Sequence, residues 1–108
     1  MSPFEQVPSF ERTPSSEQVI SSIKENGFTE EVRELLGAWI DEQQRLVEQE
    51  SIKHVDFLIQ LADIYHDSGH FEMALEAYAD AREYATQVED EDAASRILQK
   101  MLTIRGLA

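Results

Sequence analysis

Apolar residues recur at intervals of three and four along most of this chain, which is the periodicity of amphipathic helices. Val19, Ile20 and Ile23 fall on one face of a first helical segment. A longer stripe follows, made of Val32, Leu35, Leu36, Trp39, Ile40, Leu46 and Val47. No segment shows the sustained alternation that strands require. The pattern therefore predicts an all-α fold.

Capping and turn residues mark the ends of the first two helices. Ser15 directly follows Pro14, and Ser15 and Gln18 have the spacing of a capping box. Asn26-Gly27 supplies a stop for the first helix, and Thr29 is a good N-cap for the second. Gly37 lies inside the second helix at a cost of about 1 kcal/mol relative to alanine, which a close helix contact would explain.

The end of the second helix is marked by a polar run rather than by proline or glycine. The run at 48–51 shifts the phase of the apolar stripe, so we expect a break there with Ser51 as the next N-cap. One continuous helix over 29–67 is the alternative, and it would be unusually long for a globular domain.

Three further helices complete the pattern. The third, over 52–67, carries apolar residues on more than one side and should be central. A turn at 67–70 precedes a fourth helix from Phe71 to about Val88. The last helix begins in the acidic run 89–92 and stops at Arg105-Gly106. About five helices in antiparallel hairpins are therefore expected.

The length of 108 residues fits a single domain, and the start of the chain differs from the rest. Residues 1–14 hold all three prolines and little helical periodicity, which predicts an extended or flexible arm before one helical domain at 15–108. Phe4, Val7 and Phe10 recur in this arm. They either pack on the helical body or form a strip that recognises a partner or covers a groove.

Composition then excludes several classes of function. The chain has 22 acidic and 9 basic residues, a formal net charge of −13 and no cysteine. Such a charge disfavours nucleic acid and anionic membranes as partners, and the lack of cysteine excludes disulfides and thiolate metal sites. No targeting segment or membrane span is visible, so a cytoplasmic location is expected.

Residues 58–81 resemble a tetratricopeptide repeat (TPR), with one clear repeat at about 55–88. The matching positions, in the large, small and aromatic order of that family, are Leu58, Leu61, Ala62, Tyr65, Gly69, Phe71, Ala74, Tyr78 and Ala81. Small residues let two antiparallel helices approach closely, and larger ones fill the gaps beside them. Leu58 stands where the family often has Trp, and Thr86 where its closing Pro is expected. The resemblance implies a superhelix of helical hairpins with the last helix as a cap. The alternative is a generic helical hairpin with well-placed alanines.

In such repeats, partners lie along the first helix of each hairpin. By register, the partner-binding positions here are Asp56, Ile59, Gln60, Asp63, His66 and Asp67. Some relatives hold a partner's terminal carboxylate with Lys, Arg and Asn at such places, and the aspartates here argue against that mode. An acidic groove favours a basic segment through complementary potential. The alternative is that these aspartates form an ordinary solvated helix face.

No motif in the chain indicates catalysis or a cofactor. Asp63, His66, Asp67 and His70 cluster near one turn, but Gly69 breaks the helix between the histidines, so no metal site is predicted. There is no phosphate-binding loop and no nucleophile motif. We expect a non-enzymatic protein–protein interaction module, adaptor or chaperone-like. Self-association as a homodimer through an apolar helix face is the first alternative. An acidic mimic of nucleic acid is the second.

Overall fold

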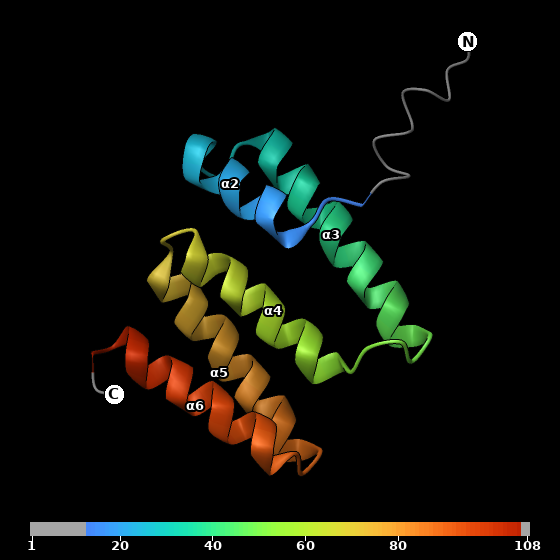
Figure 1. The fold of residues 1–108 in the computed structure, drawn as a ribbon, viewed down its shortest axis with the longest axis vertical. Coiled ribbons are helices and arrows are strands. Elements are labelled where there is room, and N and C mark those ends of the chain that lie inside the picture. Colours follow the sequence, from blue (N-terminus) through green and yellow to red (C-terminus); the bar gives the residue numbers. More distant parts are fainter. Residues whose placement is uncertain (1–12, 107–108) are drawn as a thin grey trace.

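The computed structural model describes residues 13–106, and within this range the chain forms helices and no strands (Figure 1). The five helices are α2 (Ser16–Asn26), α3 (Glu30–Glu48), α4 (His54–Asp67), α5 (Phe71–Gln87) and α6 (Glu91–Ile104). The predicted all-α class is therefore confirmed. The expected arm at 1–14 lies almost wholly outside the described residues.

Consecutive helices run in alternating directions, with α4 in the middle of the molecule (Figure 1). The α2–α3 pair lies on one side of α4, and the α5–α6 pair lies on the other. In this view α5 passes behind α4 and α6, so that α4 and α6 face the same side. Short loops allow this arrangement, because each helix can turn back along its predecessor.

The predicted caps at the start of the domain are confirmed. The Ser15 hydroxyl accepts a hydrogen bond from the backbone N–H of Gln18 at 3.1 Å, and the Gln18 side chain accepts one from the Ser15 N–H at 2.8 Å. The Thr29 hydroxyl accepts from the N–H of Val32 at 3.2 Å. Gly27 ends α2 with a positive φ of 74°, a conformation that glycine adopts without a steric penalty.

The break between α3 and α4 is also confirmed, but the predicted cap is wrong. Glu50 adopts a left-handed conformation with φ of 62°, and the N–H of Ser51 donates to the carbonyl of Leu46 at 2.8 Å. Ser51 therefore closes α3 in the manner of a Schellman motif and is not available to open α4. Lys53 is the N-cap of α4 and makes no side-chain capping hydrogen bond.

The core consists of two apolar clusters that meet on α4. The first cluster joins α4, α5 and α6, and its buried residues are Val55, Ile59, Ala62, Ala74, Tyr78, Ala81, Ala85, Ala93 and Ile97. The second joins α2, α3 and α4 through Val19, Ile23, Val32, Leu36, Trp39, Phe57 and Ile64. Because α4 contributes to both clusters, it is the central helix. This confirms the position predicted from its apolar residues on more than one side.

Three alanines form the contact between α4 and α5. Ala62, Ala74 and Ala81 are all fully buried and belong to the same cluster as Tyr78. Alanine has a small apolar side chain, so alanines at these positions allow neighbouring helices to lie close together. The burial that the sequence pattern predicts for these alanines is confirmed.

Gly37 does not have the close contact that the sequence led us to expect. A β-carbon built on Gly37 meets no atom within 4 Å, whereas Gly69 has a φ of 91° that residues with side chains rarely adopt.

Gly37→Ala should therefore raise the free energy of unfolding by about 0.5–1 kcal/mol, because alanine has a higher helix propensity than glycine. Thermal or urea unfolding measures this, and Gly69→Ala, which should destabilise, is the matched control. A loss of stability in Gly37→Ala would contradict the observed open space.

Candidate functional site

The six residues expected to bind a partner do not all face solvent. Gln60 and Asp67 are exposed, and Asp56, Asp63 and His66 are partly exposed. Ile59 is only 6% exposed, because it packs in the cluster that joins α4, α5 and α6. Ile59 is thus a core residue in this structure and not a residue of an open groove.

Asp63 is held by interactions within the domain. It accepts a hydrogen bond from the hydroxyl of Tyr78 on α5, and Nζ of Lys100 on α6 lies 3.4 Å from its Oδ1. Burial, followed by the nearby Asp63 carboxylate, strongly raises the pKa of Tyr78, so the phenol stays protonated and remains a donor. Asp63, Tyr78 and Lys100 therefore connect α4, α5 and α6, and Lys100 partly compensates the charge of Asp63.

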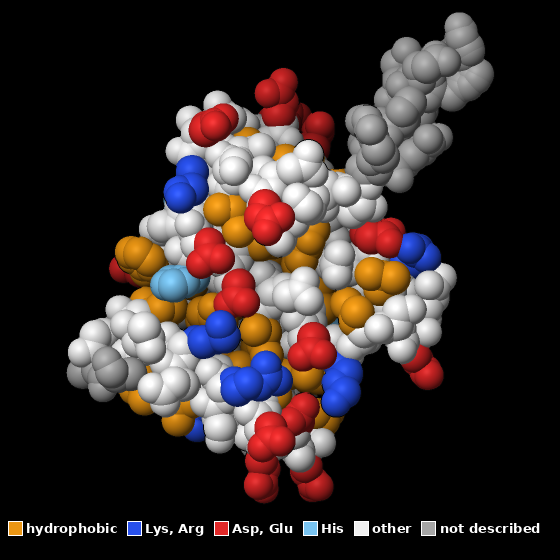
Figure 2. Space-filling view, in the orientation of Figure 1, with side chains coloured by type: hydrophobic (Ala, Val, Ile, Leu, Met, Phe, Trp, Pro, Cys, Tyr) orange, Lys and Arg blue, Asp and Glu red, His pale blue; other side chains and the backbone are white. Residues whose placement is uncertain are grey.

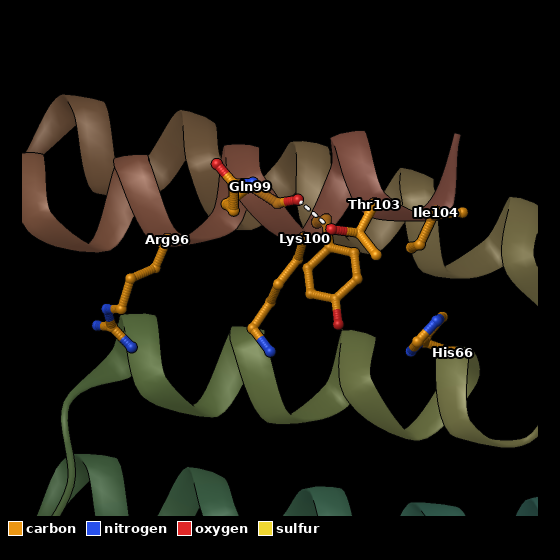
Figure 3. A pocket seen from close by; sticks show the side chains of 7 residues that line it. His66, Arg96, Gln99, Lys100, Thr103 and Ile104 are labelled. Carbon is orange, nitrogen blue, oxygen red and sulfur yellow. Dashed lines mark hydrogen bonds between the residues drawn. The ribbon is translucent and has the colours of Figure 1, made fainter. Parts of the chain in front are cut away.

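A pocket of about 370 Å³ opens beside this group, between α4, α5 and α6. Its lining residues are His66, Tyr78, Arg96, Gln99, Lys100, Thr103 and Ile104. Figure 3 shows the side chains of Arg96, Lys100 and His66 in the space between α6 and α4. The pocket therefore combines an aromatic ring and an aliphatic side chain with cationic groups at its edge.

The charge of this pocket differs from that of the whole chain. None of its lining residues is acidic, although acidic residues outnumber basic ones by 22 to 9. Arg96 and Lys100 are four residues apart and so lie on the same face of α6. In Figure 2, basic and acidic side chains lie next to one another on the face that α4 and α6 share. The aspartates of α4 thus lie opposite two basic residues of α6, Arg96 and Lys100, at this pocket.

The sequence-based reasoning did not identify Arg96 and Lys100. The resemblance implies that the last helix is a cap, and groove-facing residues are expected on the third helix. Their spacing of four was a usable signal, because two basic residues one turn apart on an amphipathic helix share a surface.

The histidines near the turn between α4 and α5 lie against aromatic rings. His66 is 5.6 Å from Phe71 and His70 is 4.7 Å from Phe28, measured between ring centroids. The two imidazoles thus have different neighbours and do not converge on one point. Among the described residues, no group of three or more His, Asp or Glu side chains is arranged to hold a metal ion.

None of the helices within 13–106 combines the length and the apolar character needed to cross a membrane.

Comparison with protein-family models, with curated proteins and with solved structures finds no match for this chain. The resemblance to tetratricopeptide repeats therefore rests on the residue pattern at 58–81, with which the all-helical fold is compatible.

Proposed function

We propose that this chain is a non-enzymatic protein–protein interaction module of the adaptor or chaperone-like kind. The observation that carries the proposal is the pocket between α4, α5 and α6, in which apolar side chains are surrounded by polar and charged ones. An apolar floor with a few polar groups at the edge is the usual composition of a docking site. The proposed mechanism is docking, with no bond made or broken.

The proposed scaffold is a tetratricopeptide-like repeat formed by α4 and α5, with α2–α3 before it and α6 as a cap. The buried alanines of the α4–α5 contact and the position of α4 between two clusters support this proposal. In such a scaffold α2, α4 and α6 would line the concave face. The pocket would lie on that face, because residues of α4 and α6 line it.

A partner with a basic segment is favoured. The chain carries a net charge of −13, and Asp56 and Asp67 remain accessible along α4. The negative electrostatic potential of such a chain increases the association rate of a basic partner, and this attraction becomes weaker as salt is added. Asp63 contributes less to this attraction, since Lys100 lies beside it.

Charge reversal on α4 tests the proposal. A random peptide library displayed on phage is selected on the immobilised full-length chain, and enriched peptides are synthesised for measurement of Kd. We expect enrichment in Lys and Arg, and binding weakened about five- to thirtyfold by the double change Asp56→Lys with Asp67→Lys, because two rim charges contribute about 0.5–1 kcal/mol each. Added salt should weaken binding to the wild type more than to this variant.

The matched control is Asp80→Lys with Glu83→Lys, which changes the net charge equally at two exposed positions of α5. This control should alter Kd by less than about twofold. If no peptide binds the chain saturably, the proposed docking function is overturned. Equal losses in both double variants would show that total charge, and not the α4 side of the groove, attracts the peptide.

A second candidate function is self-association through α6. Leu98 is 37% exposed, and Leu102 is partly exposed one turn later on the same helix. A second copy could cover these leucines across a two-fold axis. Mass measured in solution over a range of concentrations tests this, and Leu98→Lys should abolish any dimer that depends on this face.

A further inference from the structure

The basic side of the pocket has hydrogen-bonding capacity that the domain leaves unused. Arg96 forms no ion pair with any residue in 13–106, and its guanidinium carries five donors in a planar arrangement. Lys100 has three donors, and Asp63 is its ion-pair partner within the same range. The two side chains lie in the space between α6 and α4 (Figure 3). An acceptor placed at this edge would therefore find several donors.

The apolar part of the pocket lies directly beside these donors. Ile104 follows Lys100 by one turn of α6, and the ring of Tyr78 forms the adjoining wall. A volume of about 370 Å³ is near the lower end of the range of about 300–1,000 Å³ for ligand pockets. Such a space suits one or two side chains of a bound segment.

We infer that the pocket between α4, α5 and α6 anchors a partner segment through one apolar side chain and an adjacent Asp or Glu side chain. The apolar side chain would pack against Tyr78 and Ile104, and the carboxylate would accept hydrogen bonds from Arg96 and Lys100. The inference rests on the proposed docking function and adds the chemistry of the anchoring residues. Charge complementarity selects this occupant, since none of the residues lining the pocket is acidic.

An acidic anchor is compatible with a partner that is basic overall. Long-range attraction depends on the net charge of −13, whereas a carboxylate in the pocket responds to the donors within hydrogen-bond distance. Asp56 and Asp67 on α4 and Arg96 on α6 carry opposite charges. A matching segment would therefore place basic residues beside Asp56 and Asp67 and its acidic residue beside Arg96.

The selected peptides described above provide the test, synthesised with an amide at the carboxyl end so that side chains supply the only carboxylates. We expect enriched peptides to share an Asp or Glu next to a large apolar residue. Arg96→Glu should weaken their binding at least tenfold, since a charge-assisted hydrogen bond is replaced by repulsion between like charges. Arg82→Glu, the same change at an exposed position of α5, is the matched control and should leave Kd within about twofold.

The outcomes separate the inference from the proposed function. Loss of binding with Arg96→Glu but not with Arg82→Glu supports the anchor, and circular dichroism checks that both variants stay folded. If Arg96→Glu does not fold, Arg96→Gln keeps a similar volume and should weaken binding in the same direction. Peptides that bind normally to the folded Arg96 variant, or only with a free carboxyl end, overturn the anchor and leave the docking function intact. A chain that selects no peptide overturns both.

Discussion

Trp39→Ala is expected to lower the free energy of unfolding by about 3–5 kcal/mol, the largest effect of any single change considered for this chain. Trp39 is 2% exposed in the cluster that joins α2, α3 and α4, and its ring lies 6.0 Å from that of Phe57. Removing the indole leaves a cavity that the helices around it fill only in part. Domains of this size have total stabilities of about 5–15 kcal/mol, so this loss removes a large share of the total.

Urea and thermal unfolding followed by circular dichroism measure the change. Phe71→Ala is the matched control, because it also truncates an aromatic ring to a methyl group, at a position that is 53% exposed. The control should cost less than about 1 kcal/mol. Similar losses in the two variants would mean that Trp39 does not lie in a packed core.

Ala74→Leu is expected to destabilise the domain by about 1–3 kcal/mol. Ala74 is fully buried in the cluster that joins α4, α5 and α6, and Ala62 and Ala81 are fully buried in the same cluster. Three added carbon atoms require the helices to move apart or force side chains out of their preferred rotamers. The gain from the larger apolar side chain should not offset this strain, because protein interiors are close-packed and Ala74 is fully buried.

The same substitution at an exposed position of α5 separates overpacking from helix propensity. Ala79→Leu changes the same residue types in the same helix, and we expect it to stay within about 0.5 kcal/mol of the wild type. Denaturant midpoints of both variants, measured with unchanged m-values, provide the comparison. An Ala74→Leu variant as stable as the wild type would remove the close packing on which the repeat resemblance depends.

Local signals in the sequence predicted the helices well, because each depends on residues close together in the chain. The Ser15–Gln18 capping box and the Thr29 cap are both formed as their spacing indicates. The buried alanines of α4 and α5 were predicted from one residue pattern, since a hairpin places neighbouring helices in contact. These features required no knowledge of how distant helices pack.

The errors concern properties that only the tertiary arrangement decides. Ile59 was expected in the groove, but it is buried in the cluster that joins α4, α5 and α6. Asp63 was expected to face a partner, whereas Tyr78 and Lys100 reach it from two other helices. The basic residues of α6 were not predicted at the groove for the same reason. Arg96 lies beside α4 only because α6 folds back along α5.

The position of α4 also determines how the domain could be divided. Its residues complete one cluster with α2 and α3 and another with α5 and α6, so neither outer pair has a finished interior of its own. A fragment that ends before His54, or one that begins after Asp67, would leave apolar side chains without the helix that covers them. Gene fusions and truncations of this chain should therefore keep all five described helices together, and the two clusters should unfold in one cooperative transition.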